Sequence, residues 1–338
     1  MNKTEQGVLH QSKLIHLLIH ILLFLTFCLT HSASAETFAA DTASHDKSTQ
    51  KHHVFIIYSQ DNTLHANIIQ KLSENLKLKR PDIIISEVTP EEKIKAIDSN
   101  TDLIIGIGYT GMRSADKHYP KTKKLFISTD PNKYRLDKNK NKNDAILYMA
   151  QPYCRQIPFI KLLNGQWKTI GLLNSRDKPI DTDAIQQCAK KHGLDTYIVN
   201  TTGDEQLKDH IKDVLNHADI LLALPDKNIF NSQSVKNILL TSYRHRKPVI
   251  AFSRNFVDAG ALASIYSSTE QIAQSASELV GQYFKSGQQF KKSVNYPQAF
   301  DVSINRQVFR ALDLSIPDLD EIKQTLNYSE TEKAGKLQ

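Results

Sequence analysis

The sequence lacks the signatures of the common enzyme and nucleic-acid-binding classes. It contains no GxSxG nucleophile elbow, no Walker loop and no HExxH zinc motif. Its formal net charge is +7, but the lysines and arginines are spread along the chain, apart from residues 138–142 and the pair Lys291-Lys292. Nucleic-acid binding would require a basic stripe together with a known binding motif, and the sequence has neither. The composition therefore favours a globular protein with a well-solvated surface.

Long hydrophobic runs are also missing, except for one near the amino terminus. Residues 14–29 are mostly apolar and follow a polar start that contains two lysines. Ala33-Ser34-Ala35 comes shortly afterwards and matches the small-x-small pattern of a cleavage site. The pattern predicts a signal peptide over residues 1–35, cleaved after Ala35, and hence export to the periplasm.

Two alternatives compete with cleavage. The apolar run could be kept as a membrane anchor, but it is short for a span and contains two histidines. Cys28 could carry a lipid, but a lipoprotein signal has a small residue before its cysteine, and here Phe27 stands there. Residues 36–52 are polar and have no period, which is typical of a flexible linker.

Cysteine is scarce, and removal of the signal peptide would leave only Cys154 and Cys188. These two residues could pair in an oxidising compartment. The sequence does not decide between a disulfide and two separate buried thiols, so both remain open. Metal ligands at fixed spacing are missing as well. We therefore predict neither a metal site nor a cofactor.

The sequence does contain a repeated alternation of short apolar runs and amphipathic segments. One cycle starts with an expected strand at residues 54–58 and an expected helix at 64–78, and a second cycle starts with a strand at 169–173. Strands that alternate with helices predict parallel sheets with helices on both faces. We therefore predict an α/β protein of two doubly wound parallel-sheet lobes with a ligand cleft between them.

The order of these cycles also predicts how the chain divides between the lobes. We expect residues 53–148 and 256–290 in the first lobe. Residues 149–255 and 295–318 are expected in the second lobe, and residues 319–338 form a charged C-terminal tail. We expect the tail to fray beyond Tyr328.

One stretch of the second cycle indicates where a ligand would bind. The apolar run of residues 220–224 ends at Pro225, and Asp226 and Asn228 follow before a helix that Asn231 or Ser232 would cap. In parallel α/β sheets, ligands bind at such turns between the end of a strand and the start of a helix. The simpler interpretation is that Asp226 only caps its own turn.

Other expected strand ends carry short polar side chains of the same kind. Such a polar and mostly neutral set is typical of a pocket that holds a small ligand. Gly108 would let the backbone approach a ligand, Tyr109 could stack on a ring, and Asp226 or Asp258 could pair with an amine. The full set of expected ligand-binding residues is Ser59, Gln60, Gly108, Tyr109, Thr110 and Asp130 from the first lobe, and Asn174, Ser175, Asp226, Asn228, Ser253 and Asp258 from the second.

Four segments together resemble the substrate-binding proteins of ABC transporters, in particular the tryptophan- and tyrosine-binding type with the type I periplasmic binding protein fold. The resemblance covers about residues 53–318 and rests on the order and spacing of the segments, since no single motif is specific. The segments are LPDKN at 224–228 with SQSV at 232–235, KPVIAF at 247–252, DAGALAS at 258–264, and INR at 304–306 with ALDLSIP at 311–317.

The resemblance implies two α/β lobes joined by three crossings, one small ligand, and a membrane permease and ATPase as partners. Many relatives have Thr or Ser before the aspartate of the first segment and Asn directly after it. Here Pro225 precedes Asp226, and Lys227 separates it from Asn228. The resemblance therefore does not fix the ligand class.

The leading hypothesis is an exported, monomeric solute-binding protein that takes an amino acid or a related small polar or aromatic molecule for an ABC importer. A ligand-sensing accessory of a membrane receptor is the second hypothesis, and the sequence hardly separates the two. An exported α/β enzyme is the third. The GxGxxG-like run at 106–111 does not favour it, because a lone match of this kind is weak and export argues against a nicotinamide cofactor.

Overall fold

The computed structural model describes most of the chain from residue 51 onward. The predicted signal peptide (1–35) and nearly all of the predicted linker lie outside the described residues, and the first strand starts at His52, the last linker position. No helix among the described residues is long and apolar enough to cross a bilayer. The described residues are 51–59, 62–89, 100–128, 144–176, 180–201 and 204–335.

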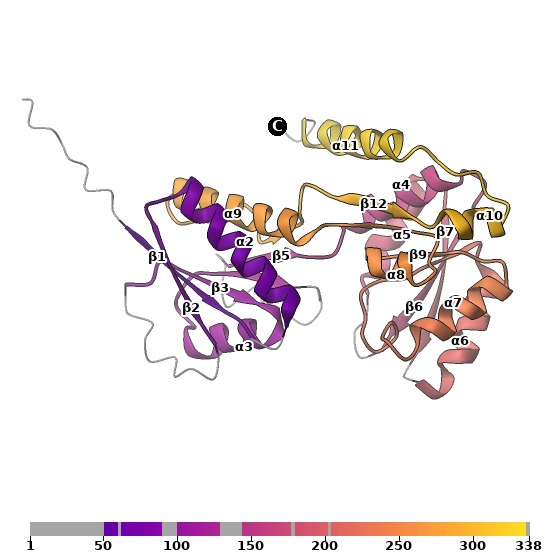
Figure 1. Cartoon of the computed structure of the whole chain (residues 1–338), viewed down its shortest axis with the longest axis horizontal. Coiled ribbons are helices and arrows are strands. Elements are labelled where there is room, and N and C mark those ends of the chain that lie inside the picture. The colour runs from indigo at the N-terminus through magenta and orange to yellow at the C-terminus, as the bar shows by residue number, and fades with distance from the viewer. Residues whose placement is uncertain are drawn as a thin grey trace, which may run out of the picture. The chain divides into compact units, whose positions relative to one another are not determined.

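The first sheet has the strand order β11-β5-β4-β3-β1-β2, and all its neighbouring strands pair in parallel. Figure 1 labels β1, β2, β3 and β5 of this sheet. Its central strands are continuous apolar runs, as expected for strands covered on both faces. The strands are β1 (His52–Ile57), β2 (Ile83–Val88), β3 (Leu103–Ile107), β4 (Lys124–Ser128), β5 (Ala145–Tyr148) and β11 (Val294–Asn295).

The second sheet has the strand order β12-β10-β9-β8-β6-β7. It is parallel except for its edge strand β12, which runs antiparallel to β10. The prediction of two mostly parallel, doubly wound sheets is therefore confirmed. The strands are β6 (Thr169–Ser175), β7 (Asp195–Thr201), β8 (Ile220–Leu222), β9 (Val249–Ala251), β10 (Ala263–Tyr266) and β12 (Asp301–Ile304).

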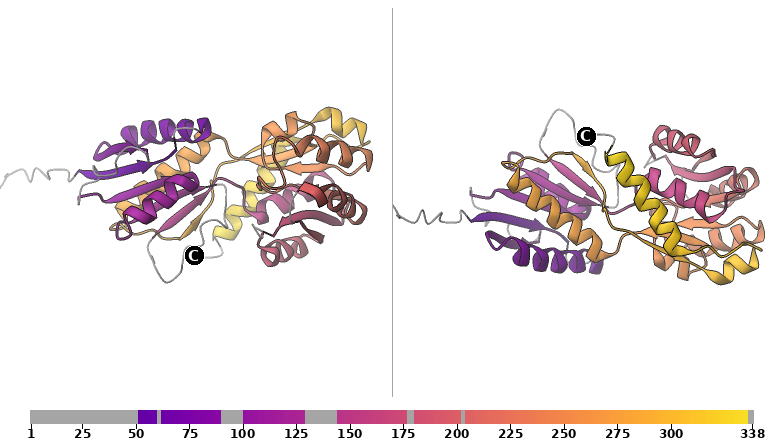
Figure 2. Two further views of the ribbon diagram at one scale, coloured as in Figure 1. Left: turned by 90° about the horizontal axis from the view of Figure 1, so that it is seen from below. Right: turned by 90° about the horizontal axis from the view of Figure 1, so that it is seen from above.

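Helices cover both faces of each sheet, as the alternating sequence predicts. On the first sheet, α2 and α9 pack beside each other on one face, and α3 packs on the other; Figure 2 shows α9 in orange next to α2 in indigo. The described helices are α2 (Thr63–Lys79), α3 (Gly108–His118), α4 (Tyr153–Leu163), α5 (Thr182–Lys191), α6 (Asp204–His217), α7 (Val235–Arg244), α8 (Arg254–Asp258), α9 (Thr269–Lys285), α10 (Arg306–Ala311) and α11 (Leu319–Gly335).

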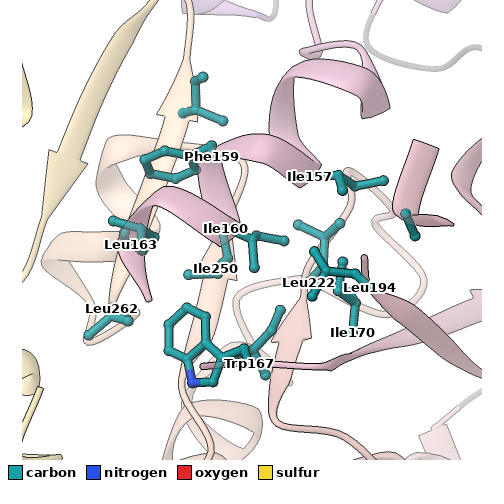
Figure 3. Close-up of a cluster of buried hydrophobic side chains, with 14 of the residues drawn as sticks. Ile157, Phe159, Ile160, Leu163, Trp167, Ile170, Leu194, Leu222, Ile250 and Leu262 are labelled. Atoms are coloured by element: carbon teal, nitrogen blue, oxygen red, sulfur yellow. The ribbon is translucent and has the colours of Figure 1, made fainter. Parts of the chain in front are cut away.

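Alternate residues of each strand point to opposite faces, so each sheet separates two apolar cores. Ile105 of β3 packs with α2 and α9, whereas its neighbour Ile104 packs with Met112 of α3. The second sheet is built in the same way. Figure 3 shows one of its cores, in which Phe159 and Ile160 of α4 and Trp167 pack close to strand residues such as Ile250.

One part of the predicted division between the lobes is wrong. Residues 256–290 were expected in the first lobe, but β10 pairs in parallel with β9 of the second sheet. The return to the first lobe begins only after Tyr266, with α9. The sequence could not decide this, because an apolar strand has the same composition in either sheet. Residue 295 also differs from expectation, since it belongs to β11 and pairs with β5.

The chain passes between the two sheets three times, after β5, after β10 and after β11. The first passage leads into α4, whose first turn carries Cys154. Cys154 is joined by a disulfide to Cys188 of α5, with the two Cα atoms 5.3 Å apart. The sequence left this pairing open, and in the structure it ties together two helices of the same lobe.

The C-terminal tail is more ordered than the sequence indicates. Residues 319–335 form α11, which lies against α4 of the second lobe. Ile322 and Leu326 are four residues apart and therefore share one face of this helix, and both are buried in the same apolar cluster as Phe159. The segment is rich in charged residues, so this short apolar stripe is difficult to recognise from the sequence.

The buried stripe of α11 leads to a stability prediction. Leu326→Ala should lower the free energy of unfolding by about 2–5 kcal/mol, because the truncation leaves a cavity in a closed core. The leucine side chain is 1% exposed. Tyr328→Ala is the matched control on the same helix, since Tyr328 is 73% exposed. Urea denaturation of both variants measures the difference, and equal midpoints would show that α11 is not docked.

Candidate functional site

The carboxyl edge of the first sheet holds part of the predicted set. Ser59 follows β1, and Gly108, Tyr109 and Thr110 form the first turn of α3 directly after β3. We expected this helix to begin at residue 112, but it begins at Gly108 with no intervening loop. Gln60 and Asp130, the two remaining first-lobe predictions, lie outside the described residues.

Two glycines make this direct connection between strand and helix feasible. Gly108 has a φ of +67°, a left-handed conformation that costs little only for glycine. A Cβ atom at Gly111 would collide with the carbonyl oxygen of Ile57, at the end of β1. Ile107, the residue at the N-cap position of α3, makes no side-chain capping hydrogen bond. The first turn of α3 lies directly against the end of the neighbouring strand.

His65 also belongs to this edge, and we did not predict it. It lies in the first turn of α2, and a Cβ atom at Gly108 would collide with its imidazole ring. The ring therefore occupies the space that the missing side chain leaves. His65 follows β1 by a few positions, so the sequence does place it near this edge. A single histidine on an amphipathic helix is nevertheless too weak a signal to predict a site residue.

The imidazole of His65 has an unusual environment for a histidine near the surface. Its Nδ1 atom is buried and has no hydrogen-bond partner among the described residues. Burial lowers the pKa of His65 below its ordinary value of 6.5, because the charged form loses solvation. The ring is therefore mostly neutral at pH 7, and it can both donate and accept one hydrogen bond.

The lowered pKa of His65 predicts a pH dependence of stability. A group whose pKa is depressed in the folded state contributes stability that is present above its unfolded pKa and lost as the pH falls through the folded pKa. Wild type should therefore lose more stability than His65→Gln between about pH 7 and about pH 5. Urea denaturation across this range tests the prediction. A histidine NMR titration with a His65 pKa at or above 6.5 would contradict it.

Tyr109 is 45% exposed on α3. Arg113, one helical turn later, donates a hydrogen bond of 3.1 Å to its hydroxyl oxygen. The guanidinium group also lies 5.6 Å from the centre of the tyrosine ring, within the range of a cation–π interaction. The ring is therefore held by its own helix and still presents an exposed surface.

The carboxyl edge of the second sheet brings four predicted residues together. Asn174 and Ser175 are the last residues of β6, and both are buried. The amide of Asn174 donates to Asn200 Oδ1 at 2.7 Å, and its own oxygen accepts the backbone N–H of Ile180 at 2.9 Å. These bonds connect the end of β6 to β7 and to Ile180. Asn228 also reaches the end of β6, with its Nδ2 atom 3.5 Å from Ser175 Oγ, a long and weak hydrogen bond.

Asp226 orders the turn that follows β8. Its Oδ1 atom accepts the backbone N–H of Asn228 at 2.9 Å, which is the Asx turn expected of an aspartate in this place. Its carbonyl oxygen accepts the N–H groups of Ile229 and Phe230. Asp226 therefore does cap its own turn, as the simpler interpretation expects. Asn228, whose backbone N–H this side chain holds, also contacts Ser175 at the end of β6.

The helix after this turn starts later than predicted. We expected it at Asn231 or Ser232, but α7 begins at Val235. Asn231 does have the side-chain contacts expected of a cap, because its Oδ1 atom accepts the N–H groups of Gln233 and Ser234 at 3.0 Å. The hydroxyl of Ser234 then donates to the carbonyl of Ile229 at 2.5 Å. These local bonds compete with the helical pattern and delay its start.

Ser253 and Asp258 lie at opposite ends of one short helix. Ser253 follows β9 at the carboxyl edge and precedes α8, as predicted. Asp258 ends α8, and the carbonyl of the preceding Val257 accepts a hydrogen bond from Asn305, next to the start of β10. The expectation that Asp258 lies at the ligand-binding edge is therefore wrong. A five-residue helix is long enough to carry the chain back to the amino edge of the sheet.

The polar groups at the two edges suit binding by hydrogen bonds. They are mostly neutral amides, hydroxyls and backbone N–H groups, and a small polar ligand is recognised by a few such groups in fixed positions. Across the part of the chain that the structure describes, no three His, Cys, Asp or Glu side chains lie close enough together to hold a metal ion.

Two mostly parallel α/β sheets with helices on both faces match the type I periplasmic binding protein fold. The family model described as "ABC transporter substrate binding protein" matches residues 88–322, more than half of the chain. The chain therefore belongs to the family of ABC transporter substrate-binding proteins. The comparison with curated proteins finds no match.

Solved structures of low sequence identity share the fold. A ligand-free, open substrate-binding protein with adhesive properties from Clostridium difficile has a TM-score of 0.61 at 17% identity, covering 79% of this chain and 96% of that chain. An ABC domain from Streptococcus pneumonia in complex with L-Trp has a TM-score of 0.56, with the same identity and coverage. A conserved domain protein from Vibrio cholerae has a TM-score of 0.54 at 18% identity, covering 80% and 96%.

Proposed function

We propose that this chain is an exported, monomeric solute-binding protein that delivers a small ligand to the permease and ATPase of an ABC importer. Membership of the substrate-binding family supports binding and transport. The apolar run at residues 14–29 and the small residues Ala33-Ser34-Ala35 support export and cleavage. The protein acts by holding its ligand, and it needs no nucleic acid, metal or cofactor.

The observation that carries the proposal is the contact between the turn after β8 and the end of β6, at the carboxyl edge of the second sheet. Asp226 holds Asn228, and Asn228 contacts Ser175 at the end of β6. This arrangement places an acidic group and two neutral hydrogen-bonding groups at the edge where open α/β sheets bind ligands. The acidic group suits an amine and the neutral groups suit a polar head.

The ligand proposed on these grounds is an amino acid or a related small polar or aromatic molecule. Its carboxylate would meet the amino terminus of α3, where Gly108 allows close approach of the backbone. Its amine would meet Asp226, and a ring could lie on Tyr109. Ser59, Thr110, Asn174 and Ser253 complete the described part of the proposed site, which also includes Gln60 and Asp130.

A thermal-shift screen of the mature chain, from residue 36, tests the proposed function. The panel contains the L-amino acids, their decarboxylated amines, simple sugars and small anions, and calorimetry confirms each hit. We expect an amino acid to raise the melting temperature in a concentration-dependent way. If no compound in the panel binds, or if a bound compound is chemically converted, the proposed function is wrong.

A further inference from the structure

The three segments that connect the sheets are joined to one another by side chains. Gln151, in the first segment, donates from Nε2 to the hydroxyl of Ser267, in the second, at 2.8 Å. The same hydroxyl donates to the carbonyl of Ala299, in the third, at 2.7 Å. A single chain of hydrogen bonds therefore runs through all three segments.

Arg155 adds a second connection between the first and third segments. Its Nη1 atom lies 2.6 Å from Gln151 Oε1 and 2.9 Å from the carbonyl oxygen of Pro297. The guanidinium group lies 4.7 Å from the centre of the Phe300 ring. Arg155 is 3% exposed, so its charge is stabilised by these contacts more than by water.

These contacts lie in the segments that connect the two lobes, where a hinge motion takes place. Hinge motions of two-lobed proteins change the backbone angles of a few connecting residues, while the lobes move as rigid bodies. A hydrogen bond between two connecting segments favours the backbone angles at which it forms. Gln151 and Ser267 each form hydrogen bonds with two partners. A change in the backbone angles of one connecting segment therefore breaks bonds that also hold the other segments.

The network is anchored on the side of the second lobe. Arg155 and Gln156 lie in the first turn of α4, and the amide of Gln156 donates to the carbonyl of Gln151 at 2.8 Å. The disulfide of the adjacent Cys154 fixes this turn to α5. Motion at the hinge therefore has to occur in the connecting segments themselves and not in α4.

We propose that Gln151, Arg155 and Ser267 form a hinge lock that sets the balance between open and closed arrangements of the two sheets. They are positioning residues, since they act through the connecting segments and not through contact with ligand. The inference rests on the proposed function, because the balance between open and closed arrangements affects function only if the protein captures its ligand by closing the two lobes. Weakening the lock changes which arrangement is populated before any ligand arrives.

The test measures the distance between the lobes in the full mature chain without ligand. Nitroxide labels on Lys77→Cys in α2 and Lys208→Cys in α6, with the native disulfide kept oxidised, report this distance by double electron–electron resonance. Ser267→Ala and Arg155→Met should each shift the ratio of the populated distances by about 2- to 10-fold, the change in an equilibrium constant on losing one hydrogen bond.

Matched controls make similar contacts away from the connecting segments. Ser286→Ala removes a hydroxyl that donates to backbone carbonyls at the end of α9, and Arg246→Met removes an exposed arginine paired with Asp313. Distance distributions of Ser267→Ala and the controls that coincide with wild type would overturn the proposal, even if Arg155→Met fails to fold. Because no ligand is added, this result does not depend on whether the screen identifies a solute.

Discussion

Asp144→Ala should lower the free energy of unfolding by about 3–5 kcal/mol, because it leaves a buried lysine without its main counter-charge. Lys124 is fully buried at the start of β4, and its Nζ atom lies 3.7 Å from Asp144 Oδ2. The other carboxylate oxygen of Asp144 accepts the backbone N–H of Lys124 at 2.9 Å. Burial raises the pKa of Asp144, and the charge of Lys124 opposes this shift.

The chain provides a matched control for this prediction. Asp116 also faces Lys124, with its Oδ1 atom 4.0 Å from Nζ, but its side chain is about half exposed. Asp116→Ala should therefore cost less than about 1 kcal/mol, as is usual for exposed ion pairs. Urea denaturation at pH 7 measures both variants. Equal losses in the two variants would mean that burial does not govern the strength of this pair.

Asp226→Ala should weaken binding of the compound identified in the screen by about 10- to 150-fold, the effect of losing a hydrogen bond to a charged group. The variant loses the carboxylate that we propose for the ligand amine. It also loses the bond that holds the backbone of Asn228. The fold should persist, because the turn lies at the edge of the sheet and the strands keep their pairing.

Asp258→Ala is the control for the binding experiment. Both aspartates were expected at the ligand-binding edge from the sequence, but Asp258 is exposed at the end of α8, next to the amino edge of the sheet. Calorimetric titration of the two variants should show a change in Asp226→Ala only. An unchanged dissociation constant in Asp226→Ala would remove this residue from the proposed site.

Sequence reasoning succeeded where a feature depends on a local pattern. Residues 145–148 form an apolar run, and the structure has β5 there. The turn after β8 contains Pro225 and Asp226, and the aspartate makes the expected backbone contact. Patterns of this kind reflect interactions within about ten residues, which the order of amino acids contains directly.

Sequence reasoning failed where the position of a segment depends on contacts with residues far away in the sequence. Residues 263–266 are a strand in either lobe, and only pairing with β9 assigns them to the second sheet. His65 becomes part of an edge because Gly108, far along the chain, leaves room for its ring. Leu326 is buried because α4 is there to cover it.

The amino-acid sequence by itself determined the class of the protein, since the period of its apolar residues requires strands and helices in alternation, and its strand ends are polar. The tertiary structure alone decided which strand ends share an edge, which cysteines are joined, and how Gln151, Ser267 and Arg155 meet. These contacts connect residues up to 116 positions apart. Chain folding brings such residues together through packing of whole elements, and no short stretch of sequence records that packing.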